Sequence, residues 1–128
     1  MAANTEQRKY IRVPFKTAAY LWSLEQDAKE IRCDQTRDIS LKGLYCYSDT
    51  KFSAETPCEL ELHLTGTSSK VVLFFKGRVV RADEKGMGIR FEEMDLDSFF
   101  LLKNILNYNT GDPEQIDREL TGYIHKKS

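Results

Sequence analysis

Two arginines near the start of the chain, Arg8 and Arg12, have the residue type and spacing to bind a phosphorylated ligand. A guanidinium can hold a phosphate through two parallel hydrogen bonds, meet the O6/N7 edge of guanine in the same way, and stack on a base. Lys9, between them, adds a positive charge suited to long-range attraction of an anion. Basic residues near a terminus are often only solvated charges, so the pair by itself is weak support for a binding site.

A second group of candidate residues, Asp38, Ser40 and Gly43, lies further along the chain in the segment Asp-Ile-Ser-Leu-Lys-Gly. Asp and Ser side chains can bond neighbouring backbone N–H groups, and we expect Gly43 to supply a positive φ angle, so a turn is predicted. A carboxylate and a hydroxyl group on alternate residues of an extended segment can also face the same way. The carboxylate can then accept hydrogen bonds from guanine N1–H and N2–H₂.

The rest of the chain predicts strands that would position these motifs. Glu59–Leu64 alternates strictly, with its leucines on one face and His63 on the polar face, which is typical of a half-buried strand. Gly77 is predicted to mark a bulge or bend, and Asp83–Gly86 a hairpin turn. The six predicted strands are Lys16–Leu24, Lys29–Asp38, Gly43–Ser48, Glu59–Leu64, Lys70–Arg81 and Met87–Phe91. They favour a mainly β fold, a barrel before a sandwich, because closure removes exposed edges.

Two helices are predicted after the strands. The first is expected to plug or flank the barrel, with Asp95 or Asp97 as its N-cap. Its apolar stripe is predicted at Leu96, Phe99, Phe100, Lys103 and Leu106. Asp112 as N-cap, followed by Pro113, begins the second helix, with an apolar face at Ile116, Leu120, Tyr123 and Ile124. That face needs a partner, either the barrel or a second subunit, so a homodimer is one option.

The composition limits the classes of protein. At 128 residues, with 41% apolar and 30% charged residues, the chain reads as one globular domain. Its formal net charge of −1 argues against a protein that coats a nucleic-acid polymer, so any anion site must be local. No apolar run approaches the roughly 18 residues needed to span a bilayer, and no secretory signal is visible. We therefore expect a cytoplasmic protein without membrane insertion.

Residues for catalysis or metal binding are not grouped in the sequence. Cys33, Cys46 and Cys58 include no Cys-x-x-Cys pair, and we expect buried or partly buried thiols. His63 and His125 are too far apart to form a local metal pair. No nucleophile–base pair and no phosphate-binding glycine loop is present. The expectation is a binding protein, not an enzyme, with no catalytic residue, metal site or cofactor.

Taken in order, Arg-x-x-x-Arg at 8–12 and Asp-x-Ser-x-x-Gly at 38–43 resemble the PilZ domain family. The resemblance covers roughly residues 8–106, since Gly77–Arg81, Gly86–Phe91 and the helix that follows also look like that family. It implies a six-stranded antiparallel β-barrel of the split-barrel type with a C-terminal helix. It also implies that cyclic di-GMP is the ligand, held between the N-terminal loop and the barrel surface.

The resemblance carries over to the candidate residues one by one. Arg8 and Arg12 match the family arginines that contact phosphate and guanine, and Lys9 lies between them. Asp38, Ser40 and Gly43 match the motif that receives guanine and shapes its turn. Arg37, Lys42 and Arg90 are weaker candidates, more typical of solvated strand-end charges.

We expect a flexible N-terminal arm over residues 1–7, a PilZ-like barrel with its first helix over 8–108, and a second helix with a tail over 109–128. About a dozen residues before the first strand are expected to be free without ligand. An anion bridging Arg8, Arg12 and Asp38 would order them against the barrel and so alter association with a downstream protein partner.

Two other functions remain compatible with the same residues. One is a ligand-independent PilZ-like adaptor that acts through protein contacts. The other is a small barrel that binds single-stranded nucleic acid, with Tyr45, Tyr47, Phe74 and Phe75 as stacking platforms, although the balanced charge argues against it. The sequence leaves open the regulated process, the oligomeric state, the partner and whether one ligand or two bind.

Overall fold

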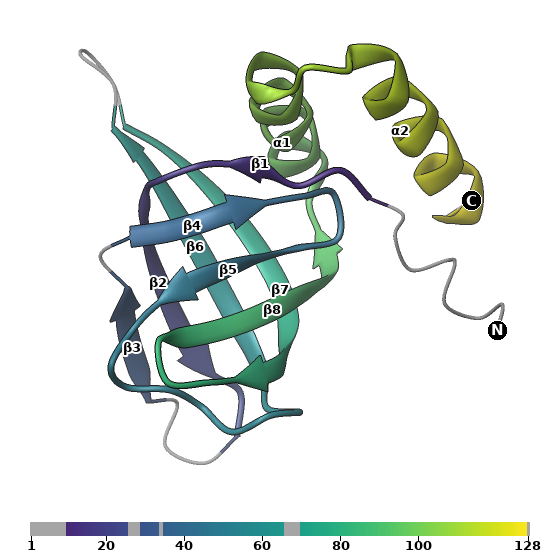
Figure 1. Ribbon diagram of the computed structural model, residues 1–128. Helices are drawn as coiled ribbons and strands as arrows, with labels where there is room; N and C mark the ends of the chain where they lie inside the picture. The colour runs from purple at the N-terminus through teal and green to yellow at the C-terminus, as the bar shows by residue number, and fades with distance from the viewer. Residues whose placement is uncertain (1–9, 26–28, 34, 66–69, 128) are drawn as a thin grey trace, which may run out of the picture.

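The computed structural model describes residues 10–25, 29–33, 35–65 and 70–127. Its strands form one antiparallel sheet followed by two helices, which confirms the predicted mainly β class (Figure 1). The strands are β1 (Val13–Pro14), β2 (Ala18–Ser23), β3 (Glu30–Cys33), β4 (Gln35–Ile39), β5 (Gly43–Tyr47), β6 (Pro57–Thr65), β7 (Lys70–Ala82) and β8 (Gly86–Met94). The helices are α1 (Leu96–Asn109) and α2 (Pro113–Lys127). The strand order in the sheet is β1-β4-β5-β8-β7-β6-β2-β3.

The sheet curls into a partly closed barrel because the chain passes directly from one edge of the sheet to the strands near the other edge. β3 and β4 follow one another in sequence, yet β3 pairs with β2 at one end and β4 with β1 and β5 at the other (Figure 1). The buried Thr36 hydroxyl group donates to the Phe15 carbonyl at 2.5 Å and accepts the Thr17 N–H at 3.0 Å. These bonds attach β4 to the connection between β1 and β2.

The prediction of six strands is wrong, since the described residues form eight. The segment Lys29–Asp38 was expected to be one strand, but it is divided into β3 and β4 because its hydrogen-bonding partner changes from β2 to β5. The other additional strand is β1. Its two residues pair with Ile39 and Asp38, and so short a strand has no alternation that a sequence pattern could reveal.

The core lies on the inner face of the curled sheet. The alternation predicted for Glu59–Leu64 is confirmed in β6, where Leu60 and Leu62 are fully buried. Phe75 and Phe91 stack nearly parallel inside the barrel, with ring centroids 4.0 Å apart. Burial of such side chains contributes about 1.5–3 kcal/mol each to folding, so this inner face supplies most of the force that holds the strands in place.

Both helices begin at predicted N-caps. The Asp95 carboxylate accepts the Ser98 N–H at 2.7 Å, and the Asp112 carboxylate accepts the Gln115 N–H at 3.2 Å. Each bond satisfies a backbone donor that the first helical turn leaves without an intrahelical partner. Among the described residues, no helix is long and apolar enough to cross a membrane.

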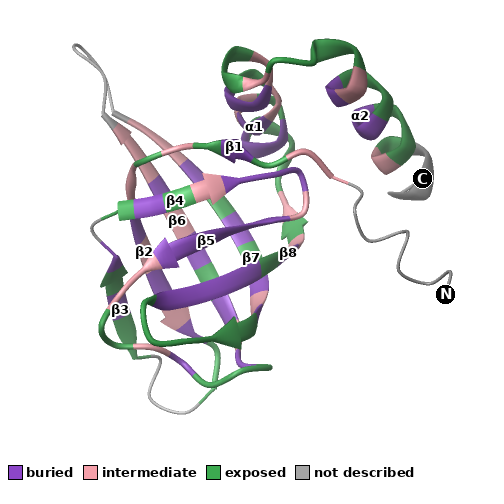
Figure 2. Cartoon of the chain, viewed as in Figure 1, coloured by how far each residue is buried: buried purple, intermediate pink, exposed green. Residues whose placement is uncertain are grey.

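The apolar stripe predicted for α1 is partly wrong. Leu96 is 67% exposed and Phe100 50% exposed, so these two side chains face outward. The buried residues of α1 are Ser98, Phe99, Leu102, Ile105 and Leu106. One cause is Ser98, whose hydroxyl group accepts the Phe74 N–H at 2.8 Å and so turns its own side of the helix toward β7. Figure 2 shows a buried and an exposed side on both helices.

The predicted β7–β8 turn is confirmed. The Asp83 N–H donates to the Gly86 carbonyl at 2.9 Å, and the Asp83 carboxylate accepts the N–H groups of Lys85 and Gly86 at 2.9 and 3.0 Å. The bulge predicted at Gly77 is also confirmed, because the pairing of β7 with β8 shifts register between Lys76 and Gly77. The turn and the bulge set the direction in which β7 and β8 carry their outward side chains.

Candidate functional site

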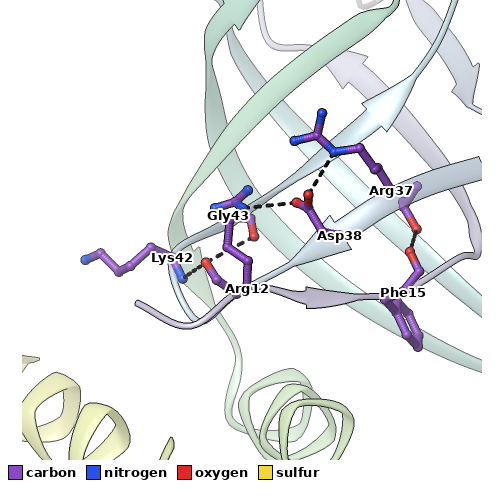
Figure 3. A network of polar contacts seen from close by, with 8 residues as sticks. Arg12, Phe15, Arg37, Asp38, Lys42 and Gly43 are labelled. Carbon is purple, nitrogen blue, oxygen red and sulfur yellow. Dashed lines mark hydrogen bonds and ion pairs between the residues drawn. The ribbon is translucent and has the colours of Figure 1, made fainter. Parts of the chain in front are cut away.

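The short strand β1 brings the two sequence motifs together. Val13 pairs with Ile39 and Pro14 with Asp38, so the residue just before β1 reaches the end of β4. As a result the Arg12 Nε lies 3.0 Å from the Asp38 Oδ1 (Figure 3). The Arg12 side chain is 46% exposed and that of Asp38 17%, so the ion pair lies at the outer surface of the barrel.

A second arginine occupies the other oxygen of the same carboxylate. The Arg37 Nε lies 2.8 Å from the Asp38 Oδ2, and this hydrogen bond raises the pKa of the Arg37 guanidinium (Figure 3). Arg37 also lies over the Tyr45 ring, with its guanidinium carbon 4.1 Å from the ring centroid, and Arg81 lies over the same ring at 5.3 Å. Arg12 and Arg37 therefore share one carboxylate, and Arg37 and Arg81 share the Tyr45 ring.

Tyr45 anchors this cluster to the β7–β8 turn. Its hydroxyl group donates to the Asp83 carboxylate at 2.5 Å. Burial, together with this bond, raises the pKa of Tyr45 to about 12, and the same bond lowers the pKa of Asp83. Tyr45 is thus a neutral donor and Asp83 an anion at neutral pH. We call Arg12, Arg37, Asp38, Tyr45 and Arg81 the arginine cluster.

Ser40 and Gly43 build the turn that follows β4. The Ser40 hydroxyl group accepts the Lys42 N–H at 3.1 Å, and the Ser40 N–H donates to the Gly43 carbonyl at 2.8 Å. The Ser40 side chain is fully buried, so these contacts support its predicted turn role. The expected positive φ at Gly43 is wrong. Glycine is required there because a Cβ atom would collide with the Ile89 carbonyl oxygen of β8.

The first two candidate residues, Arg8 and Lys9, lie outside the described residues. The chain just after them is already attached to the protein. Tyr10 and Ile11 pack against the core, and the Ile11 N–H donates to the Glu119 carboxylate of α2. From Tyr10 onward this segment therefore contacts the core and α2, and its ordering by a ligand stays a prediction.

Two members of the arginine cluster, Tyr45 and Arg81, were not among the residues predicted to bind cyclic di-GMP. Asp38 pairs with Tyr45, and Gly88 of β8 pairs with both Tyr45 and Arg81. Residues that pair directly point to the same face of a sheet, so these side chains share the outer face with Asp38. A sequence pattern could find this row only with the strand order and register in hand. Arg37, a weaker candidate expected to be a solvated charge, is exposed and also contacts both Asp38 and Tyr45.

The structure does not assemble the four aromatics of the nucleic-acid interpretation into one platform. Tyr45 and Tyr47 contact each other with ring centroids 5.7 Å apart. Phe75 stacks on Phe91 in the core, and Phe74 points outward from β7 beside α1. A stacking platform needs exposed rings on a common surface, and these rings are divided between the core and separate faces.

Comparison with known proteins finds one family and similar folds. The family model for the PilZ domain matches residues 6–108. The Bacillus subtilis inhibitor of motility (MotI/DgrA) has a similar structure, with a TM-score of 0.62 and 21% identity over 90% of this chain and 52% of that one. The PilZ domain of CeSA from a cellulose-synthesizing bacterium has a TM-score of 0.50 and 18% identity over 74% of this chain and 93% of that one. No curated protein matches the sequence.

The matches differ in how much of each chain they cover. The chain spans about half the length of the motility inhibitor. At these identities, both structural similarities concern the fold alone. The family match ends before α2 begins at Pro113, so α2 is a feature of this chain beyond the matched region.

Proposed function

Because this chain belongs to the PilZ domain family, we propose that it is a receptor for cyclic di-GMP that acts by changing its association with another protein, and not by catalysis. The observation that carries the proposal is the ion pair of Arg12 with Asp38, which joins the two motifs at 3.0 Å. The ligand's phosphates need cationic partners and its guanine N–H groups need an acceptor. This pair supplies one of each on an accessible surface.

The arginine cluster has further N–H donors that can bind an anion. A guanidinium carries five N–H donors, and Arg12 uses its Nε for Asp38, so its terminal amino groups can hold a phosphate. Asp38 retains further lone pairs for the guanine N1–H and N2–H₂. Arg37, fixed over Tyr45, offers a planar surface for base stacking.

The charge of the cluster suits a ligand with two phosphodiester groups. Within it, the three arginines outnumber the Asp38 carboxylate and the neighbouring Asp83. Arg8 and Lys9 would add the further positive charge that burial of two phosphates requires. In this mechanism Ser40 and Gly43 act by holding the turn beside Asp38.

Calorimetric titration with cyclic di-GMP tests the receptor function. We expect saturable binding, with a stoichiometry that distinguishes one ligand from an intercalated pair. Arg12→Ala should weaken binding at least about thirtyfold, because loss of one arm of a phosphate clamp costs roughly 2–5 kcal/mol. Arg118→Ala, an exposed arginine on α2, is the matched control and should bind as the unchanged protein does. No heat and no thermal stabilisation with the unchanged protein would exclude the receptor function.

A ligand-independent adaptor is the second candidate function. It is favoured by an exposed apolar surface that includes Phe74 of β7 and Phe100 of α1, neither of which belongs to the arginine cluster. Failure of the calorimetric test together with partner binding at that surface would select the adaptor.

A further inference from the structure

Exposed apolar side chains gather in one region of the protein surface. Among the described residues, seven large apolar side chains are exposed, and five of them line two adjoining depressions. The five are Leu24, Phe74, Leu96, Phe100 and Ile124. Single exposed apolar residues are normal on a protein surface, but contiguous patches mark sites of interaction.

The two depressions form a continuous surface. The first, about 660 Å³, lies over β2, β6 and β7 and includes Trp22 and Phe74. The second, about 600 Å³, lies between the start of α1 and the end of α2 and includes Phe100 and Ile124. Both are lined by Glu93–Asp95. The bond from the Phe74 N–H to the Ser98 hydroxyl group keeps the first turn of α1 beside β7. We call this surface the apolar strip.

The charges along the apolar strip are mainly negative. Among the side chains that the structure describes, the acidic ones lining the strip are Glu59, Glu61, Glu93 and Asp95, and the basic one is Lys76. Lys76 pairs across the strands with Glu59 on one side and Glu93 on the other, so it is enclosed by acidic neighbours. The apolar strip therefore combines an apolar surface with an acidic border, the reverse in sign of the arginine cluster.

We propose that the apolar strip is the docking surface for a partner protein that presents a basic amphipathic segment. Apolar side chains of that segment would cover Phe74, Leu96 and Phe100, and its lysines or arginines would meet the acidic border. A second copy of this chain fits poorly, because a two-fold contact would set the same acidic border against itself. An anionic lipid surface would be repelled for the same reason.

This proposal goes beyond the receptor function and does not depend on it. The apolar strip and the arginine cluster share no residue, so binding at one can be measured while the other is unoccupied. Part of the strip comes from Ile124 of α2, which lies outside the region matched by the family. The part of the strip outside α2 lies within the matched region.

Trp22 provides the readout, since it is the single tryptophan of the chain and lines the first depression. The probe is a tryptophan-free peptide of leucine and lysine with leucines at helical spacing, titrated into the full chain without nucleotide. We expect a saturable change in Trp22 fluorescence that weakens with rising salt. A peptide with the same leucines and with glutamate in place of lysine should bind at least about tenfold more weakly, because its carboxylates are repelled by the acidic border.

Variants locate the binding. Phe74→Ser, and separately the pair Glu59→Gln with Glu93→Gln, should each weaken the basic peptide by about tenfold or more. Val80→Ser is the matched control, because Val80 is also an exposed apolar residue of β7 but does not line the strip. It should bind the peptide as the unchanged protein does.

Three results would overturn the proposal. They are equal binding of the acidic peptide, an equal loss of binding in Val80→Ser, and light scattering that shows a dimer dissociated by Phe74→Ser, which would assign the strip to a second copy. Peptide binding without any cyclic di-GMP binding would leave this proposal standing and remove only the receptor function.

Discussion

The carboxylate of Glu119 accepts the backbone N–H of Ile11 through both of its oxygens, at 2.9 and 3.2 Å. The two residues are 108 positions apart, and Glu119 is a buried acidic residue on α2. Ile11 directly precedes Arg12, so the C-terminal helix holds the backbone next to the Arg12–Asp38 ion pair. Lys42 adds to this junction, with its amino group 5.6 Å from the ring centroids of both Tyr10 and Tyr123.

Replacement of Glu119 should release the N-terminal segment. In Glu119→Leu the partly buried Ile11 N–H loses its acceptor, which costs about 1–3 kcal/mol of local stability. We expect the Ile11 amide to exchange hydrogen at least about fivefold faster in native-state exchange measured by NMR. Glu114→Leu alters an exposed glutamate of the same helix and should leave that rate unchanged. Equal rates in Glu119→Leu and the unchanged protein would contradict a role for this bond in holding the segment.

Gly43→Ala should destabilise the barrel because the new methyl group would collide with the Ile89 carbonyl oxygen of the neighbouring strand. Overpacking of this kind costs about 1–3 kcal/mol, which urea denaturation would measure as a lower midpoint. Gly111→Ala is the control, since nothing lies within 4 Å of the added atom, and its stability should stay the same or rise slightly. If both variants have the midpoint of the unchanged protein, the close approach of β5 and β8 is not limiting.

The bond between Tyr45 and Asp83 should make stability depend on pH in acid. It lowers the pKa of Asp83 below its ordinary value of 3.8, so the unfolded chain binds a proton more readily than the folded protein. The stabilisation is therefore present above pH 3.8 and is lost as the pH falls through the lower folded pKa. Tyr45→Phe should reduce thermal stability at pH 7 and make its decline in acid less steep.

Thermal unfolding of Tyr45→Phe and of the unchanged protein, measured at about five pH values between 7 and 2, would reveal this difference. Tyr47→Phe, which leaves the Tyr45 hydroxyl group in place, should keep the full acid decline. Parallel pH profiles for Tyr45→Phe and the unchanged protein would show that the Tyr45 bond does not contribute to the dependence of stability on pH.

The three thiols should be almost inert in the folded protein. Cys33, Cys46 and Cys58 are fully buried, as the sequence predicted, and the sulfur atoms of Cys33 and Cys46 lie 3.2 Å apart. Burial raises the pKa of Cys58 to about 11. The pKa of Cys46 is also raised, mainly by its hydrogen bond with Cys33 and also by burial. At pH 7 the Cys58 thiolate is then about a hundredfold scarcer than that of an exposed cysteine. An aromatic disulfide reagent should react at least about a hundredfold faster in urea than without it, and similar rates would contradict this burial.

Local patterns explain what could be predicted of the fold. The alternating leucines of β6, the caps at Asp95 and Asp112, and the turn at Asp83 each depend on residues a few positions apart. Such features follow from backbone geometry and short-range hydrogen bonds, so they can be derived without the rest of the molecule. The division of Lys29–Asp38 into two strands could not, because it depends on which distant strands each half meets.

The candidate site also has features that could be predicted from the sequence and features that could not. The types and order of Arg12, Asp38 and Ser40 made them candidates through their resemblance to the PilZ motifs, and ligand binding at them stays a prediction. That Asp38 is shared between Arg12 and Arg37, and that Tyr45 and Arg81 complete the cluster, required the strand pairing.

By itself the sequence determined the mainly β class, the two helices that follow the strands and the family, since these depend on residue type and short-range spacing. The residues it indicated for nucleotide binding stay a prediction. The tertiary structure alone decided how the sheet curls, which face of α1 is exposed and that Glu119 reaches Ile11. These features arise from contacts between residues far apart in the chain, whose partners are chosen by packing and by the satisfaction of buried hydrogen bonds in the whole molecule.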